Sequence, residues 1–332
     1  MKKTFLAVLS FVVALSSAQA QKITGAGSTF DYPIFSKWFS EYSAAHPGVE
    51  INYQSIGSGG GIQQVTNGTV EFGASDMPMK DAQLAESKVK LVHIPVVLGA
   101  VVPTYNVPGV SDLRFSPDVL AGIFLGKITN WNDPRIAMDN PGARLPNLRI
   151  TVIHRSDGSG TTFVWTDYLS KISPAWKNGP SSGTSINWPT GVGGKGNEGV
   201  SGMIRQIPGS IGYVELIYAL QNHIPYGSVR NAAGNWVKGS IEGVTAAAAT
   251  AKIPNDYRVS ITNAPGPSAY PISSFSWLLI PTHPTDMAKE KVIKDMLSWI
   301  IKSGESQAAS LSYAPLPQNL AQRVLQTIYA LP

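Results

Sequence analysis

Apolar residues recur every three or four positions in three stretches of the chain, at 34–42, 164–169 and 292–300. This spacing places apolar side chains along one face of an α-helix. Asp31 stands before the first stretch and Gly304 after the last, and these residue types commonly begin and end helices. The pattern therefore predicts three amphipathic helices, each with one buried face.

Four shorter stretches have the pattern of β-strands. Residues 49–53 alternate between apolar and polar, while 71–75, 149–154 and 211–216 are short runs next to polar or glycine-rich turns. Apolar positions at 62–65 predict a short helix between the first two strands. Strands that alternate with helices in this way indicate an α/β architecture with largely parallel sheets.

The first twenty residues have the organisation of a cleavable secretory signal. Lys2 and Lys3 precede an apolar run at 5–15, and a small-x-small sequence ends at Ala20. The alternative, a membrane anchor, needs roughly 20 apolar residues, and this run is shorter. We therefore expect residues 1–20 to be removed on export. Because the chain has no cysteine at the cleavage point, we expect no lipid anchor.

The composition excludes several classes of function. The chain has 332 residues and no cysteine, so it has no disulfide, no thiolate metal site and no cysteine nucleophile. Its 26 basic and 21 acidic residues are scattered, without the basic runs that bind nucleic acid. The five histidines are isolated and lack the spacing of metal ligands, so we expect neither a metal nor another cofactor.

Three turns have a similar composition and position. Residues 25–30, 57–61 and 157–162 are small, hydroxyl-bearing segments that lead into predicted helices. A helix N-terminus leaves backbone N–H groups unpaired and carries partial positive charge, and glycines let the backbone approach an anion closely. One such turn would more often be an ordinary strand–helix connection. Three together could surround a compact tetrahedral oxyanion with uncharged donors.

The named nucleotide and hydrolase motifs do not fit. Residues 191–196 satisfy G-x-G-x-x-G, but Trp188-Pro189-Thr190 precedes them and no helix start is visible after them, so we interpret the segment as a structural turn. Residues 157–160 are not the G-x-S-x-G nucleophile elbow.

At these turns the sequence resembles the periplasmic phosphate-binding proteins of ABC-type phosphate uptake systems. The segments that carry the resemblance run in family order over nearly the whole mature chain: 25–30, 57–61, 72–76, 125–128 with Trp131, 155–161, 193–197 and 208–215. The resemblance implies an α/β fold of two lobes, the type II periplasmic binding protein fold, with the ligand in the cleft between the lobes and two chain crossovers. It implies lobe one at 21–95 and 268–332, and lobe two at 96–267. Residues 230–267 depart from the family pattern.

The resemblance also implies the ligand contacts. Residues matching the family's phosphate contacts are Thr29, Phe30 (through its backbone N–H), Ser58, Asp76, Arg155, Ser159, Gly160 and Thr161. Asp157 matches the residue that pairs with Arg155 and holds its guanidinium in place. Gly59 is a departure, because many relatives carry a second serine there.

Asp76 is the informative position, because a carboxylate facing an anion would ordinarily repel it. Phosphate at neutral pH keeps at least one proton, which Asp76 can accept in a charge-assisted hydrogen bond, whereas sulfate has none. We expect this to favour phosphate by at least ~4 kcal/mol, roughly a thousandfold. Without the resemblance, Asp76 would be interpreted as a helix cap.

The predicted function is to bind inorganic phosphate in the periplasm and deliver it to an inner-membrane ABC permease. The protein is expected to be a monomer, with no enzymatic activity and no nucleic-acid partner. Two alternatives are an extracellular adhesion or matrix-associated protein on the same phosphate-binding scaffold, and a phosphatase. For the phosphatase, Ser58 or Ser159 would be the nucleophile, but neither has a base and orienting group nearby in sequence.

Overall fold

The computed structural model of the protein describes residues 21–332, so the export signal expected at 1–20 lies outside the described residues. Its strands are β1 (Gln21–Gly27), β2 (Val49–Ser55), β3 (Phe72–Ser75), β4 (Leu91–Tyr105), β5 (Arg114–Phe115), β6 (Thr151–Arg155), β7 (Val192–Gly194), β8 (Ser210–Glu215), β9 (Ser228–Arg230), β10 (Trp236–Val237) and β11 (Ser273–Pro281). Its helices are α1 (Tyr32–Ala45), α2 (Ser58–Thr66), α3 (Asp81–Glu86), α4 (Pro117–Phe124), α5 (Pro134–Asp139), α6 (Gly160–Ile172), α7 (Pro174–Asn178), α8 (Gly196–Gln206), α9 (Leu216–Gln221), α10 (Ile241–Ala249), α11 (Met287–Lys302), the 3₁₀ helix η1 (Gly304–Leu311) and α12 (Gln318–Tyr329).

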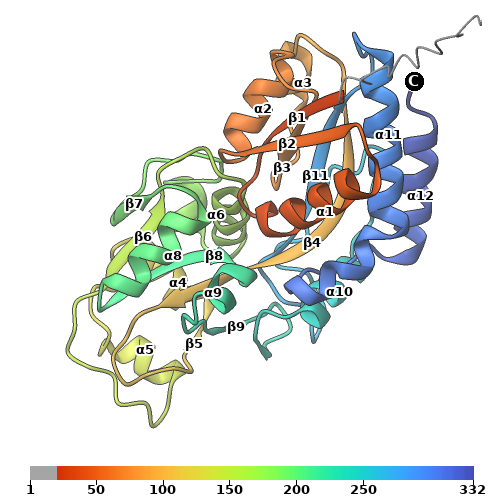
Figure 1. Ribbon diagram of the computed structural model, residues 1–332. Helices are drawn as coiled ribbons and strands as arrows, with labels where there is room; N and C mark the ends of the chain where they lie inside the picture. The colour runs from red at the N-terminus through yellow and green to blue at the C-terminus, as the bar shows by residue number, and fades with distance from the viewer. Residues whose placement is uncertain (1–20) are drawn as a thin grey trace, which may run out of the picture.

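Eight strands form one sheet, in the order β2-β1-β3-β11-β4-β8-β6-β7 (Figure 1). We call the part built on β1, β2, β3 and β11 the first half, and the part built on β6, β7 and β8 the second half. Within each group, β1–β3 and β6–β8, the strands pair in parallel. Between these groups, β11 and β4 pair antiparallel with each other and with β3 and β8. The α/β prediction is confirmed, but parallel pairing is limited to the two groups.

Strand β4 belongs to both halves. It is 15 residues long, pairs with β11 from Leu91 to Ala100, and pairs with β8 from Val101 to Tyr105. The boundary predicted for the lobes, at 95–96, falls inside the part paired with β11. The change of partner comes five residues later, so the chain crosses between the halves as a continuous strand rather than as a loop.

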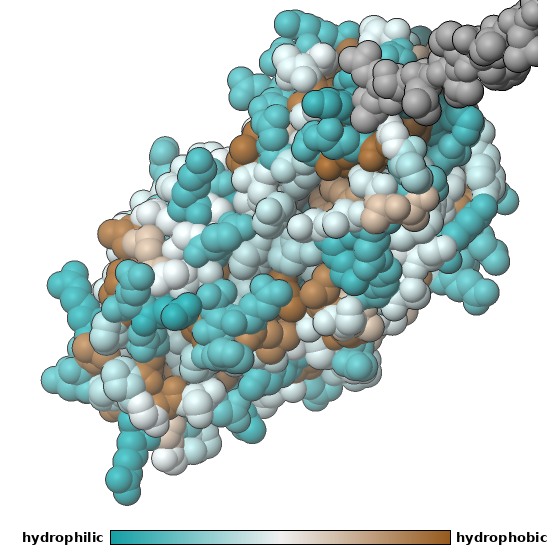
Figure 2. Space-filling model, in the orientation of Figure 1, coloured by the Kyte–Doolittle hydropathy of each residue, from teal (hydrophilic) through white to brown (hydrophobic). Residues whose placement is uncertain are grey.

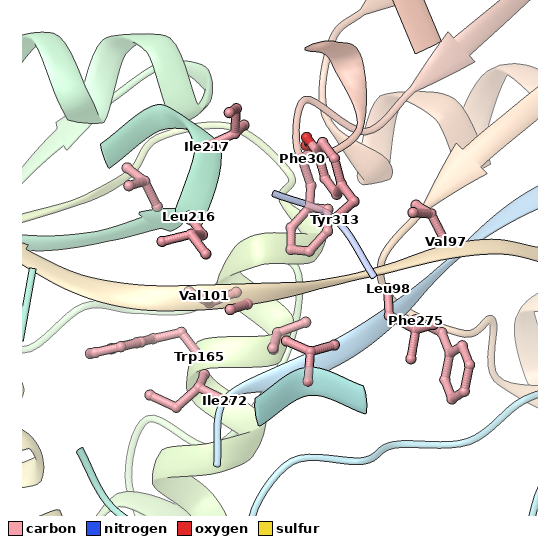
Figure 3. Packing of buried hydrophobic residues seen from close by; sticks show 14 of the residues in the cluster. Phe30, Val97, Leu98, Val101, Trp165, Leu216, Ile217, Ile272, Phe275 and Tyr313 are labelled. Carbon is pink, nitrogen blue, oxygen red and sulfur yellow. The ribbon is translucent and has the colours of Figure 1, made fainter. Parts of the chain in front are cut away.

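One hydrophobic cluster extends through both halves. Helices α1, α2 and α11 pack on the first half, and α4, α6, α8 and α9 on the second (Figure 1). Figure 3 shows where the two meet: Phe30 and Tyr313 lie on one side of β4, and Trp165 and Ile272 on the other, with Val101 between them. The halves are therefore joined by packed side chains as well as by backbone.

The predicted helices and strands are present at their expected positions, with one error in the second half. The segment 191–196, interpreted as a structural turn without a following helix, contains β7 and leads into α8, which begins at Gly196. Helix α8 contains three glycines and buries only two large apolar side chains, Val200 and Ile204. Its apolar positions Val200, Met203 and Ile204 do have helical spacing, but its three glycines, which disfavour a helix interior, concealed the helix in the sequence.

On the face of the molecule shown in Figure 2, hydrophilic side chains are widely spread and hydrophobic residues gather in small separate patches. Across residues 21–332, no helix combines the length and the apolar composition needed to cross a bilayer.

Candidate functional site

The N-termini of helices from both halves meet between them. Gly59, in the first turn of α2, donates its N–H to the carbonyl of Gly158 across the boundary, at 2.9 Å. A Cβ atom on Gly160, the first residue of α6, would clash with Ser58 Oγ and Asp76 Oδ2. Only a glycine at position 160 therefore lets α6 approach Ser58 and Asp76 this closely.

The first turn, residues 28–30, is fixed by three tyrosines. Their hydroxyls donate to three successive carbonyls: Tyr53 to that of residue 28 at 2.8 Å, Tyr218 to that of 29 at 2.6 Å, and Tyr313 to that of 30 at 2.5 Å. In a planar trans peptide the C=O and the following N–H point in opposite directions. The tyrosines therefore also fix the direction of the N–H groups in this turn.

Asp76 follows β3 and is 1% exposed. Its Oδ1 accepts hydrogen bonds from Ser28 Oγ at 2.6 Å and Ser276 Oγ at 3.0 Å. Its Oδ2 is buried and has no hydrogen-bond partner within residues 21–332. Burial raises the pKa of Asp76 to about 6, against the opposing effect of its hydrogen bonds and of the Arg155 charge.

Ser58, the first residue of α2, lies beside Asp76. Its hydroxyl accepts the Asp76 N–H at 3.2 Å and is fully buried. The preceding Gly57 has φ +87°, and a Cβ there would clash with the Asp157 carboxylate and the Gly158 carbonyl. This glycine therefore allows the tight turn before α2 that places Ser58 next to the second half.

The second half contributes a buried arginine at the end of β6. The Arg155 side chain is 1% exposed, and its Nε and Nη2 donate to the two carboxylate oxygens of Asp157 at 2.8 and 2.5 Å. Its Nη1 donates to Thr161 Oγ1 at 3.4 Å. Burial acts to raise the pKa of Asp157, but hydrogen bonds from Arg155 and its charge hold that pKa below the ordinary value. This is the pairing that the resemblance implied.

Helix α6 begins directly after this arginine pair. Ser159 is its N-cap, and the Ser159 hydroxyl accepts the N–H of Thr162 at 3.0 Å. The N–H groups of Gly160 and Thr161 lie in the first turn, where no carbonyl of the same helix can reach them. Residues 159–161 are all buried, so these amides and their partial positive charge lie in a region shielded from water.

Asn197, in the first turn of α8, is a residue the sequence reasoning missed. Its Nδ2 donates to Thr29 Oγ1 at 2.8 Å and to Thr161 Oγ1 at 3.2 Å, and its Oδ1 accepts the Glu215 N–H at 3.0 Å. It thereby connects the first turn with the start of α6. The available signal was its place directly after the 191–196 motif, but the incorrect interpretation of that motif as a turn concealed it.

All the residues predicted to contact the ligand lie around this one boundary, and all are buried. A cavity of about 190 Å³, lined by Thr29, Asp157 and Gly196 among others, reaches the boundary beside α8. The groups gathered here are hydroxyls, helix-start amides, the Arg155 guanidinium and the unpartnered Oδ2 of Asp76. Such a set can hold a small anion that itself carries a proton. Within residues 21–332 there is no group of metal-ligating side chains.

Comparison with known proteins finds relatives that agree with one another in family. A family model described as a PBP superfamily domain matches residues 12–302. The chain is 48% identical over 307 residues to the phosphate-binding protein PstS of Xylella fastidiosa (strain Temecula1), covering 91% of this chain and 84% of the relative. It is 46% identical over 327 residues to the phosphate-binding protein PstS of Pasteurella multocida (strain Pm70), covering 97% and 94%.

Solved structures share the fold at lower identity. A high-affinity periplasmic phosphate-binding protein, PfluDING, solved with bound phosphate, matches with a TM-score of 0.76 and 20% identity over 92% of this chain and 93% of that one. The phosphate-binding protein from Stenotrophomonas maltophilia matches with a TM-score of 0.71 and 19% identity over 92% and 94%. These matches show that the α/β arrangement in two lobes is common to all three proteins.

Proposed function

Because this chain belongs to the PBP superfamily and, within it, to the family of the phosphate-binding PstS proteins, we propose that it binds inorganic phosphate between its two halves. It delivers the phosphate to an inner-membrane ABC permease for import. It acts in the periplasm as a monomer, and it binds its ligand without changing it chemically.

The observation that carries this proposal is the buried, unpartnered Oδ2 of Asp76. A buried acceptor without a donor costs on the order of 1–3 kcal/mol, more when it is charged. Phosphate removes that cost because it brings a proton to the oxygen. Sulfate brings only lone pairs, so the carboxylate repels it in a site where water cannot screen the charge.

The remaining contacts supply donors for the other phosphate oxygens. From the first half these are the hydroxyls of Thr29 and Ser58 and the backbone N–H of Phe30, which in this structure donates to Ser28 Oγ at 2.9 Å. From the second half they are the Ser159 hydroxyl, the amides of Gly160 and Thr161, and Arg155. Since Asp157 already holds Nε and Nη2 of Arg155, the guanidinium meets the ligand through Nη1, in an orientation fixed in advance.

Contacts between the halves support a closed ligand-bound form. Thr29 receives hydrogen bonds from two side chains of the second half, Asn197 on its hydroxyl and Tyr218 on its carbonyl. A ligand held from both sides favours the state in which these contacts exist. The permease recognises that closed form. We place lobe one at 21–95 and 268–332 and lobe two at 96–267, so that the chain crosses once within β4 and once just before β11.

The contacts of Ser58 and Ser159 do not support a phosphatase that uses a serine nucleophile. A serine nucleophile needs an adjacent base to take its proton. Ser58 Oγ accepts from a backbone amide of Asp76, and Ser159 Oγ from that of Thr162. Within residues 21–332, neither hydroxyl is hydrogen-bonded to a histidine or a lysine.

Isothermal titration of the purified mature chain with phosphate, arsenate and sulfate tests the proposal. We expect tight binding of phosphate at one site per chain, and sulfate binding weaker by roughly a thousandfold or more. Incubation with a chromogenic phosphate ester should release no product. Absence of phosphate binding, or equal affinities for phosphate and sulfate, would overturn the proposal.

A further inference from the structure

A second buried carboxyl group lies beside Asp76. Asp31 directly precedes α1 and is fully buried, and its Oδ1 has no hydrogen-bond partner in the described chain. Ser276, on β11, stands between the two acids. Its Oγ is in hydrogen-bond contact with Asp31 Oδ2 and with Asp76 Oδ1, the latter at 3.0 Å.

The number of protons available at this bridge decides how it is organised. A serine hydroxyl has one hydrogen and can donate it to only one of two carboxylates. If both acids were ionised, one of them would face the lone pairs of Ser276 in a buried environment. The contacts are satisfied together when one acid is protonated and donates to Ser276 Oγ, while Ser276 donates to the other acid.

The surrounding groups identify which acid holds the proton. Asp76 Oδ1 already accepts from Ser28 at 2.6 Å, and the positive charge of Arg155 favours the ionised form of Asp76. Asp31 lacks both of these. The groups that face it are Asp76, Ser276, the buried acid Glu215 and the hydroxyl-bearing rings Tyr53 and Tyr313. Burial and the charge of Asp76 raise the pKa of Asp31 well above its ordinary value.

We propose that Asp31 is a neutral carboxylic acid that donates to Ser276 and, through Ser276, holds Asp76 as the ionised acceptor. This assignment rests on the proposed phosphate function and makes Asp31 a positioning residue for specificity. Ser28 and Ser276 together hold Oδ1 of Asp76. The carboxylate therefore cannot rotate, and its Oδ2 stays directed to the site where the phosphate proton arrives.

Three variants test this role by titration with phosphate and sulfate. Asp31→Asn keeps a donor to Ser276 and keeps the site's charge, so both affinities should stay within about threefold of the unmodified protein. Asp31→Ala removes the donor, and phosphate affinity should fall about tenfold, the equivalent of one neutral hydrogen bond. Ser276→Ala removes the bridge and should lower phosphate affinity by a similar factor, with a smaller effect on sulfate.

The opposite result for Asp31→Asn would overturn the inference. If Asp31 is ionised, its replacement by asparagine removes a negative charge close to the anion. Both phosphate and sulfate would then bind tenfold or more tightly.

Infrared difference spectroscopy at pH 7 gives a reading that does not depend on ligand. In the ligand-free protein, the C=O band of protonated carboxyl groups should lose the contribution of one group in Asp31→Asn, while the contributions of Glu215 and Glu305, whose pKa values burial also raises, remain. As a matched control, Asp295→Asn, at an exposed carboxylate paired with Lys291, should leave the protonated-carboxyl region unchanged. Retention of the whole band in Asp31→Asn refutes a neutral Asp31. Failure of the unmodified protein to bind phosphate would refute the proposed function while leaving this spectroscopic test of Asp31 valid.

Discussion

The two halves of the molecule bring opposite kinds of group to one site. The first half presents an acid, Asp76, whose position is fixed by Ser28 and Ser276. The second presents a cation, Arg155, whose position is fixed by Asp157. Each charged group is fully buried. Its partners bind Oδ1 of Asp76 and Nε and Nη2 of Arg155, which leaves Asp76 Oδ2 and Arg155 Nη1 to contact the ligand. The difference suggests a division of tasks, with attraction of the anion in the second half and discrimination between anions in the first.

The largest expected effect comes from removing the discriminating group. Asp76→Asn should narrow the ratio of phosphate to sulfate affinity by roughly a thousandfold, because the amide can donate to a sulfate oxygen that the carboxylate repels. Competition titrations with phosphate and sulfate, carried out on the variant and on the unmodified protein, give the affinity ratio of each. An unchanged ratio would show that Asp76 does not accept the phosphate proton, and the division of tasks would then be wrong.

Removing the cation should weaken both anions together. Arg155→Ala should lower phosphate and sulfate affinity by about a hundredfold each, the value of a hydrogen bond to a charged group. It also leaves Asp157 half-buried without its partner, so the free energy of unfolding should fall by about 2–3 kcal/mol, below the range for a fully buried pair. The double variant Arg155→Ala/Asp157→Ala, measured by urea unfolding, should recover stability but not affinity. A large change in the ratio of phosphate to sulfate affinity would contradict the assignment of discrimination to the first half.

The contact between the halves can be separated from contacts within one half. Tyr218→Phe removes the hydrogen bond from the second half to the Thr29 carbonyl, together with the contact of the same hydroxyl with Glu198 Oε1 inside the second half. Phosphate affinity should fall about tenfold, with sulfate affected equally. Tyr53→Phe is the matched control, because its bond to the Ser28 carbonyl lies within the first half. It should lower the melting temperature with little effect on affinity. Equal losses of affinity in the two variants would show that Tyr218 does not report on closure.

The smallest effect concerns pH and sulfate. The pKa of Asp76 is raised to about 6 by burial, so the group gains a proton as the pH falls through that value. The neutral acid can donate to sulfate, so sulfate affinity should rise several-fold between pH 8 and pH 5. Sulfate keeps its own charge over this range, which makes it the cleaner probe. Asp76→Asn should show a flat profile, and a flat profile in the unmodified protein would place the titration of Asp76 outside this range.

The turns of this site could be predicted from the sequence because they are local, whereas the individual ligand contacts were implied by the resemblance to the phosphate-binding family. A glycine-rich segment between a strand and a helix determines the conformation at residues 25–30, 57–61 and 157–162 by itself, and the structure brings these turns together. The supporting residues could not be predicted in the same way. Ser276 lies 200 residues from Asp76 and Tyr218 lies 189 residues from Thr29, so only the folded chain brings them into contact. Asn197 was missed because the glycines of α8 obscure its helical pattern.

The shared strand β4 has a consequence for how the protein unfolds. Proteins with two lobes often melt in two steps, because each lobe can lose its structure alone. In this protein, unfolding of the first half would remove β11, which pairs with residues 91–100 of β4. Unfolding of the second half would remove β8, which pairs with residues 101–105 of the same strand. Heating should therefore give one cooperative calorimetric peak. Phosphate should move that peak upward as a whole, by an amount set by its concentration relative to its dissociation constant.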